Sequence, residues 1–362
     1  MDARAEQAGR ALVGPEACRR QGQPNDAGRA RGPGPSTASA VGSAARAMTF
    51  ACAAILAFMA PAHAFPDRPV RLLVGFTPGG GADTAARPLA VRLADALGQQ
   101  VVVDNRPGSS GNVAADMAAR ALPDGHTLLF GTIATFVINP LIYDRLTYDA
   151  QRDFAPVSLA AAPVNVVIVH PSVPAGSMKE LLALMRAKPG HYNYGSSGIG
   201  GTGHLAGELL ARMAGVRITH IPYKGGSAAM ADLIGGQIPV VITVVPSAMP
   251  HVKAGRARLL AVTTAKRSGL LPDVPAIAEA GLPGFEANNW YGVVAPAKTP
   301  RSRIDRLNRE IVQVLESPGL RETYHAQGIE PIPSTPAGFV DYIRAEQARW
   351  SRVVREAGIR AD

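Results

Sequence analysis

From residue 70 onward, short runs of β-branched and leucine residues alternate with longer segments rich in alanine and leucine. The runs at 70–76, 101–104 and 126–132 are typical of buried strands, and 84–97 is typical of an amphipathic helix. This alternation predicts an α/β fold, with helices packed on sheets that are mostly parallel. Pro88 lies inside the first helical pattern, where we expect it to remove a hydrogen bond or to bend the helix.

A second series of the same kind starts near Asn165 and continues to about Thr264. A segment rich in proline and glycine follows at 270–286, and the chain after it is mostly helical, with patterns at 302–315 and from about 336 to 357. This tail has too few strands to form a sheet of its own. We therefore expect it to return and complete the first domain.

The predicted organisation is a discontinuous first domain, residues 65–163 with 286–362, and a continuous second domain, residues 164–285. The chain then crosses between the domains twice. Two crossings predict a hinge, and the cleft between hinged domains is a common place for a ligand.

The first 64 residues differ from the rest of the chain. Residues 1–47 are rich in glycine, alanine, arginine and proline, so we expect them to be disordered, and we interpret them as an N-terminus extended beyond the true start of translation. Residues 48–64 form an apolar run that is too short to span a bilayer and ends in small residues. This pattern predicts a signal peptide that is cleaved after Ala64, and therefore export to the periplasm.

Composition narrows the function of the exported part. Both cysteines, Cys18 and Cys52, precede the predicted cleavage site, and the histidines after it have no spacing typical of zinc ligands. Without the first 64 residues the chain has 30 basic and 24 acidic residues, spread along the sequence. So small an excess, with few aromatic residues, argues against a nucleic-acid surface. We predict no metal, no cofactor and no nucleic-acid partner.

The stretch GSSGIGGTGH at 195–204 contains the spacing G-x-G-x-x-G between a predicted strand and a predicted helix. A dinucleotide site also needs an acidic residue about 20 residues later, which binds the ribose. No aspartate or glutamate occurs from 212 to 230, so the sequence argues against a dinucleotide.

Two more glycine-rich loops follow predicted strands, TPGGGAD at 77–83 and RPGSSGN at 106–112. Glycines ahead of a helix leave backbone N–H groups free to bind one anion, and the helix dipole favours negative charge there. One such loop is explained by a tight turn, but three at equivalent strand ends favour anion binding. A small carboxylate suits them, because three or four charge-assisted hydrogen bonds could approach the roughly −8 kcal/mol of a micromolar ligand. Arg106 and Lys224 could add charge, although each is typical of a surface residue.

An exported hydrolase is an alternative from another class. The nucleophile motif G-x-S-x-G is absent, because Ile199 occupies the position of its last glycine. His204 could act with Asp83, or with Ser196 or Ser197, if the fold brings them together. His204 is also typical of a helix start, and Asp83 is typical of an N-cap.

Several longer stretches resemble one protein family. They include FPDRPVRLLVGFTPGGGADTAARPLA, NYGSSGIGGTGHLAGELL, IPYKGGSAAMADLIGGQI and NNWYGVVAPAKTP. They resemble the tripartite tricarboxylate transporter substrate-binding proteins, also called the Bug family, along essentially the whole exported chain. The resemblance implies a monomeric, non-catalytic receptor with a two-lobed periplasmic-binding-protein type II fold, which delivers a small organic carboxylate to permease subunits in the membrane. A receptor that reports its ligand to a membrane sensor would have the same fold and site, so this alternative stays open.

The resemblance also implies the site. In the family, backbone amides and waters from two loops of the first lobe bind the carboxylate, and residues of the second lobe close over it. The matching positions in the first lobe are Thr77, Gly79, Gly80, Gly81, Asp83, Thr132, Ala134 and Thr135. Those in the second lobe are Ser196, Ser197, Gly198, Thr202, His204, Tyr223, Lys224 and Thr243.

Thr243 is a departure from the family pattern, since many relatives have an acidic residue there. If that acid meets an amino group of the ligand, an amino acid is a less suitable ligand for this chain. A dicarboxylate, a tricarboxylate or an aromatic acid then suits it better.

Overall fold

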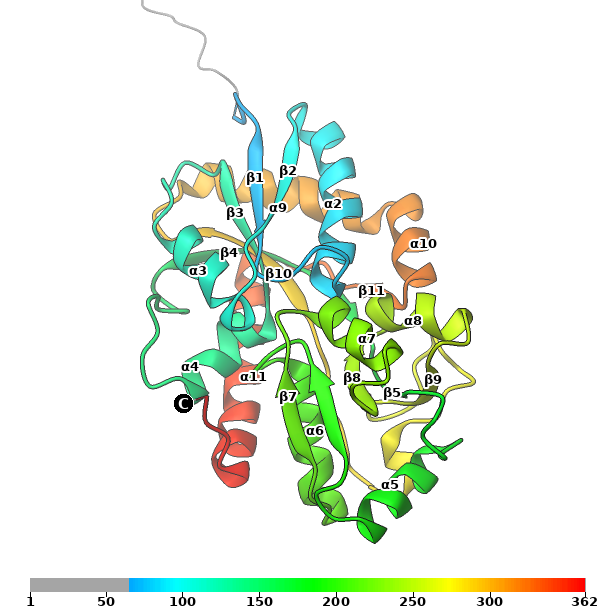
Figure 1. Ribbon diagram of the computed structural model, residues 1–362. Helices are drawn as coiled ribbons and strands as arrows, with labels where there is room; N and C mark the ends of the chain where they lie inside the picture. The colour runs from blue at the N-terminus through cyan, green and yellow to red at the C-terminus, as the bar shows by residue number, and fades with distance from the viewer. Residues whose placement is uncertain (1–64, 362) are drawn as a thin grey trace, which may run out of the picture. The chain divides into compact units, whose positions relative to one another are not determined.

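The computed structural model describes residues 65–361, which are built on two separate β-sheets (Figure 1). One sheet has six strands in the order β11–β4–β10–β3–β1–β2, and the other has five in the order β7–β6–β8–β5–β9. We call each sheet with its helices the first and the second lobe. The first contains β1 (Val70–Val74), β2 (Val101–Asn105), β3 (Thr127–Thr132), β4 (Phe154–Pro163), β10 (Tyr291–Pro296) and β11 (Ile329–Pro331). The second contains β5 (Asn165–Val169), β6 (Asn193–Ser196), β7 (Thr219–Pro222), β8 (Val240–Val244) and β9 (Arg258–Val262).

Helices cover both faces of each sheet (Figure 1). On one face of the first sheet lie α2 (Gly81–Leu97), α9 (Arg301–Glu316) and α10 (Pro318–Ala326); on the other lie α3 (Asn112–Ala119), α4 (Asn139–Ile142) and α11 (Pro336–Ala357). The second sheet is covered by α5 (Met178–Ala187) and α6 (Thr202–Ala214) on one face, and by α7 (Gly226–Ile234) and α8 (Val245–Lys253) on the other. Despite Pro88, α2 continues as one helix. No helix between residues 65 and 361 is both long and apolar enough to cross a membrane.

The continuous apolar runs of the strands explain why both faces are covered. Leu72 and Leu73 are neighbours in β1 and are both fully buried, but Leu72 packs in the core with α2 and Leu73 packs in the core with α3. Val166 and Val167 of β5 divide between the two faces of the second sheet in the same way. Because successive side chains of a strand point to opposite faces, a sheet covered on both sides needs apolar residues at every position.

The α/β class and the two-lobed arrangement are confirmed, but the sheets are mixed and not mostly parallel. β1 is parallel to β2 and β3, whereas β10 is antiparallel to β3 and β4, and β5 is antiparallel to β8 and β9. The antiparallel pairs involve β5 and β10, which are the first strands that the chain forms after it passes from one lobe to the other. β4 continues into β5 with one residue between them, so β5 begins beside the carboxyl end of β8 and runs antiparallel to it.

Hydrogen bonds hold the two chain segments that join the lobes. At the first crossing, the Val164 N–H donates to the Gly328 carbonyl (3.1 Å) and the Val164 carbonyl accepts from the Val245 N–H (2.9 Å). At the second crossing, the Ala287 carbonyl accepts from the Thr263 hydroxyl at 2.7 Å. Each of the two connecting segments is therefore tied by hydrogen bonds to neighbouring elements.

Candidate ligand-binding site

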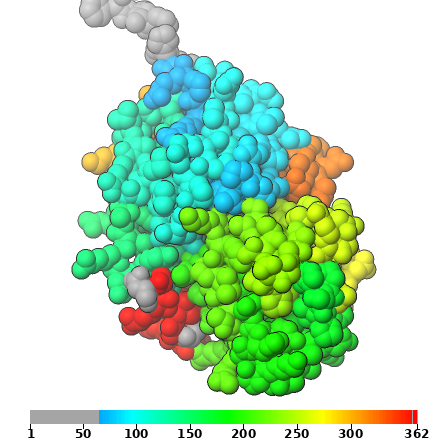
Figure 2. Space-filling model, viewed as in Figure 1, coloured from blue at the N-terminus to red at the C-terminus, as the bar shows by residue number. Residues whose placement is uncertain are grey.

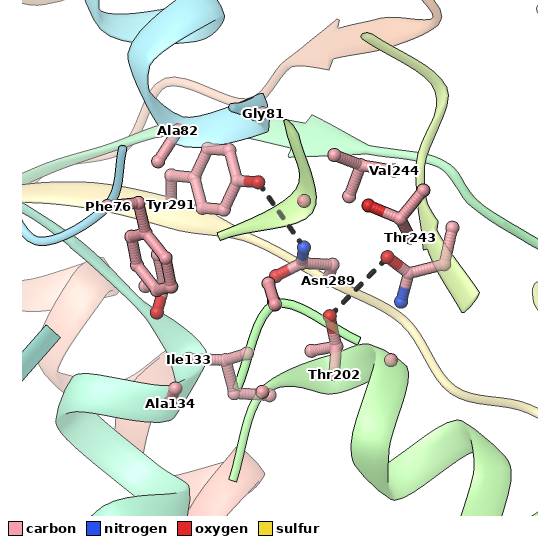
Figure 3. Close-up of a pocket in the computed structure, with 16 residues that line it drawn as sticks. Phe76, Gly81, Ala82, Ile133, Ala134, Thr202, Thr243, Val244, Asn289 and Tyr291 are labelled. Carbon is pink, nitrogen blue, oxygen red and sulfur yellow. Dashed lines mark hydrogen bonds between the residues drawn. The ribbon is translucent and has the colours of Figure 1, made fainter. Parts of the chain in front are cut away.

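A small cavity of about 30 Å³ lies between the lobes (Figure 3). Its walls come from the ends of strands and the starts of helices in both lobes. The first lobe contributes Phe76, Gly81, Ala82, Thr132, Ile133, Ala134, Asn289 and Tyr291. The second contributes Asn165, Ser197, Gly201, Thr202, Gly203, Gly226, Thr243 and Val244.

Four helices of the two lobes begin at the cavity wall. Gly81 is the first residue of α2, Thr202 of α6 and Gly226 of α7, while Val244 precedes α8. The first turns of α2, α6 and α7 present backbone N–H groups and the positive ends of the helix dipoles. α8 contributes its dipole, but its Val245 N–H already donates to the Val164 carbonyl and Pro246 has no N–H. The arrangement therefore concentrates partial positive charge on one small volume.

Glycine permits this close approach of helix starts. A Cβ atom on Gly81 would overlap the side chain of Val244 in the opposite lobe, and one on Gly203 would overlap the carbonyl oxygen of Ile242. Any other residue would hold these helices away from the cavity. The glycines of these loops are therefore required for close packing as well as for the turns.

The lining of the cavity combines polar and apolar groups and carries no charged side chain. Asn289 donates to the Tyr291 hydroxyl at 3.5 Å, and Thr202 donates to Asn165 at 3.4 Å (Figure 3). Burial raises the pKa of Tyr291, so its hydroxyl remains a neutral hydrogen-bonding group. These side chains can orient a ligand but cannot neutralise its charge.

Two buried polar atoms of the wall have no hydrogen-bond partner within the described chain. They are the hydroxyl oxygen of Thr132, which is 4% exposed, and the side-chain oxygen of Asn289, which is 9% exposed. A carboxamide has nearly the same shape in both orientations, so either end of Asn289 can face the cavity. Buried polar atoms are normally satisfied, and these two point to a polar guest in the cavity.

Of the sixteen predicted site residues, six line this cavity: Gly81, Thr132, Ala134, Ser197, Thr202 and Thr243. Three others, Gly198, Tyr223 and Lys224, line a second cavity between the lobes, of about 200 Å³. The remaining seven line neither of these two cavities: Thr77, Gly79, Gly80, Asp83, Thr135, Ser196 and His204.

Some of these seven residues have clear structural roles. The hydroxyls of Thr77 and Ser227 form a hydrogen bond of 2.9 Å between the lobes. Asp83 accepts hydrogen bonds from the Gly79 N–H and from Arg87, both at 2.9 Å. Burial opposes ionisation of Asp83, but the hydrogen bonds outweigh it and hold its pKa below the usual range. Asp83 therefore organises the loop ahead of α2.

His204 belongs to a buried cluster and not to a catalytic pair. Its Nδ1 accepts a hydrogen bond from the Gly200 N–H at 3.1 Å, and its ring stacks on His220 with centroids 4.1 Å apart. The Nε2 atom of His220 lies 2.7 Å from the Ser196 hydroxyl oxygen. Burial lowers the pKa of His204 to about 4, so the ring is neutral at neutral pH. Within the described chain, His204 forms no hydrogen bond with Ser197 and no ion pair with Asp83.

Ten of the residues that line the first cavity are not among the sixteen predicted site residues, although Ala82 and Ile133 lie in segments that the family resemblance indicated. The ten are Phe76, Ala82, Ile133, Asn165, Gly201, Gly203, Gly226, Val244, Asn289 and Tyr291. Most are neighbours of predicted positions. Asn165 and Asn289 instead lie beside the two interlobe crossings, so the predicted hinge was the signal that could have located them.

No group of three or more histidine, cysteine or acidic side chains in residues 65–361 is placed to hold a metal ion.

Comparisons with known proteins give consistent matches. A model of the family described as tripartite tricarboxylate transporter family receptor matches residues 85–359. A Pseudomonas protein encoded in the tcbD–tcbE intergenic region is 40% identical over 300 residues, which are 83% of this chain and 89% of that protein. Rpa4515 of R. palustris, solved with adipate, is 40% identical with a TM-score of 0.80, over 82% of this chain and 99% of that one. MatC from Rhodopseudomonas palustris, solved with bound malate, is 30% identical with a TM-score of 0.75, over 80% and 100% of the two chains.

Proposed function

Because this chain belongs to the tripartite tricarboxylate transporter receptor family, we propose that it captures a small organic carboxylate between its lobes and delivers it to a membrane permease. The family is one of substrate-binding receptors, so no catalytic step is part of this function. The periplasmic-binding-protein fold is confirmed by its structural relatives. Action as a monomer in the periplasm belongs to the proposal, as does the signal peptide, which lies outside the described residues.

One observation carries the proposal: a cavity without charged side chains at which four helices of both lobes begin. Each helix terminus stabilises an anion by about 0.3–1 kcal/mol, and each charge-assisted hydrogen bond contributes about 1.5–3 kcal/mol. Three or four such bonds approach the roughly −8 kcal/mol of micromolar binding before the cost of ordering the ligand. The cavity can therefore bind an anion tightly without a salt bridge.

A carboxylate with a carbon chain suits the walls of this cavity. Phe76, Ile133 and Val244 supply apolar surface beside the polar groups. Two relatives were solved with dicarboxylates, adipate and malate, which supports a ligand of the same chemical class. The predicted site residues that line the cavity, such as Thr202 and Thr243, would then contact the carboxylate or the carbon chain.

Binding requires the lobes to separate. A space of about 30 Å³ holds little more than one water molecule. On the face shown in Figure 2, atoms of the first lobe (blue and cyan) contact those of the second lobe (green) directly. Rotation at Val164 and near Ala287 would open the cavity, with the lobes divided as predicted, 65–163 with 286–362 against 164–285. Closure around the ligand is then the state that a permease recognises.

The proposal can be tested by calorimetric titration of purified residues 65–362 with a panel of mono-, di- and tricarboxylates, followed by chemical analysis of the recovered ligand. We expect saturable binding of one ligand per chain, with the ligand recovered intact. Conversion of the ligand to a product, or an affinity for amino acids above that for all simple carboxylates, would contradict the proposal.

A further inference from the structure

The positive charge of the protein is spread along the sequence but not evenly over the fold. Residues 164–285, which include every helix and strand of the second lobe, contain 11 lysines and arginines but only five aspartates and glutamates. The other described residues, 65–163 and 286–361, contain 19 basic and 18 acidic residues. The net charge is therefore +6 on the second lobe and +1 on the first. Within the second lobe, no aspartate or glutamate occurs at 181–207 or 209–231.

Part of this charge gathers at the tip of the second lobe, where α5 and α6 end (Figure 1). The Gly190 N–H donates to the Arg217 carbonyl at 2.9 Å, and the Arg186 guanidinium donates to the Ala214 carbonyl at 3.4 Å. These hydrogen bonds join the turn after α5 to the turn after α6, so the basic residues of both turns share one surface. We call this surface the cationic tip. Its four basic residues are all exposed: Arg186, Lys188, Arg212 and Arg217.

Helix stability accounts for only part of this charge. Arg186 and Arg212 lie in the last turns of α5 and α6, where a cation offsets the negative end of the helix dipole. Arg212 also forms an ion pair with Glu356 of α11, at 3.9 Å. Lys188 and Arg217 follow these helices and add two more charges. Within the described chain, no carboxylate lies within ion-pair distance of either residue.

An apolar side chain is exposed among these cations. Met213 lies next to Arg212 in the last turn of α6 and is 37% exposed. Of the large apolar side chains that are exposed in residues 65–361, it is the one on the second lobe. Lysine and arginine attract anionic lipid headgroups, and a neighbouring apolar side chain can enter the boundary between headgroups and acyl chains. Cations around an exposed methionine therefore suit the surface of an anionic bilayer.

We propose that the cationic tip binds the anionic lipid surface of the membrane that holds the permease. The inference adds a membrane-binding surface to the proposed function and does not depend on which carboxylate is bound. α6 begins at the first cavity and ends at the tip, and its 13 residues span about 20 Å, so adsorption leaves the cavity clear of the lipid. Each lysine or arginine near an anionic membrane strengthens binding roughly fivefold, so four together strengthen it by several hundredfold, on the order of 500.

Flotation of purified residues 65–362 with lipid vesicles tests this proposal. One set of vesicles contains phosphatidylcholine with anionic phosphatidylglycerol, and the other contains phosphatidylcholine alone. The tip variant carries Lys188→Gln and Arg217→Gln. The control variant carries Lys298→Gln and Arg309→Gln, at exposed positions of the first lobe that also have no carboxylate of the described chain within ion-pair distance. Both variants lose two positive charges, so they differ only in where the charge is lost.

Wild-type protein should bind the anionic vesicles and not the neutral ones, and its binding should weaken as salt is raised to about 0.15 M. The tip variant should bind the anionic vesicles roughly thirtyfold more weakly than wild type, and the control variant less than about threefold more weakly. Thermal unfolding of both variants should match wild type, since all four substituted residues are exposed.

Two results would overturn the inference. Equal losses in the two variants would mean that net charge, and not the cationic tip, controls adsorption. If wild-type protein binds neither kind of vesicle, the tip does not bind lipid, and an acidic protein surface becomes its partner. Neither result bears on the proposed function, which carboxylate calorimetry tests separately. Both variants should bind the same carboxylates as wild type with unchanged affinity, because none of the four residues lines an interlobe cavity.

Discussion

Thr243→Asp is the substitution that examines the electrostatics of the first cavity most sharply. Thr243 is 4% exposed and lines the cavity at the end of β8, where no charged side chain is present. An added carboxylate would face a bound carboxylate with no cation of the lining to compensate it. We expect a large loss of affinity for every carboxylate that the protein binds.

The size of the loss follows from the size of the cavity. For so small a cavity, we take a separation of about 5 Å between a carboxylate at position 243 and the bound carboxylate. Two like charges about 5 Å apart at an effective dielectric constant of about 20 repel by about 3 kcal/mol. That energy corresponds to a decrease in affinity on the order of a hundredfold.

Thr243→Asn is the matched control, because asparagine has the shape of aspartate without its charge. Calorimetry at neutral pH should show a loss for Thr243→Asp that far exceeds the loss for Thr243→Asn. Burial and the neighbouring anion raise the pKa of the new carboxyl group, so the difference between the two variants should shrink as the pH falls. Equal losses for the two variants would mean that steric overlap, and not charge, controls binding, and the electrostatic argument would be refuted.

Three further predictions concern packing, lobe closure and pH. Gly203→Ala should destabilise the fold by about 2 kcal/mol or more in denaturant unfolding, because the new Cβ would overlap the Ile242 carbonyl. The control Gly269→Ala, with open space around residue 269, should change the free energy of unfolding by less than about 0.5 kcal/mol. Ser110→Ala removes the hydrogen bond to the Ile199 carbonyl and should weaken ligand binding about two- to tenfold in calorimetry, while Ser109→Ala should not; equal effects would exclude this contact as a closing interaction. Burial lowers the pKa of His204 to about 4 and that of His220 to about 3. Below about pH 6.5 the unfolded chain therefore binds more protons than the folded chain. The free energy of unfolding should fall as the pH drops from about 6.5 towards 4, by roughly 3 kcal/mol at most for His204. His204→Gln should flatten this dependence and His191→Gln, at an exposed position, should not; an unchanged slope in His204→Gln would show that other groups cause it.

The α/β fold could be predicted because its signals are local. Runs such as that of β1 are apolar at successive positions, and the amphipathic pattern of α9 marks one buried face. Strand direction could not be predicted for β5 and β10, because it depends on which lobe the chain enters or leaves. No pattern within a strand records that, so the sheets were expected to be more parallel than they are.

Part of the candidate site could be predicted, because some of its signals are also local in the sequence. Glycine before a helix is visible in the sequence, and Gly81 and Thr202 were located by it. Asn289 and Tyr291 reach the cavity only because the chain returns from the second lobe at that point, which is a tertiary effect. Asp83 and His204 have residue types suited to a site. The His204 ring instead accepts a hydrogen bond from Gly200 of its own loop, and the Asp83 carboxylate accepts from Gly79, Arg87 and Asn105.

The central claim is that backbone N–H groups at helix starts of both lobes hold the carboxylate. It is tested most directly by a crystal structure of residues 65–362 with the tightest-binding dicarboxylate of the calorimetric panel. We predict carboxylate oxygens about 2.7–3.1 Å from backbone nitrogens at the starts of α2 and α6, inside the first cavity. A ligand bound outside the interlobe cleft, or held within it by charged side chains alone, would contradict the account.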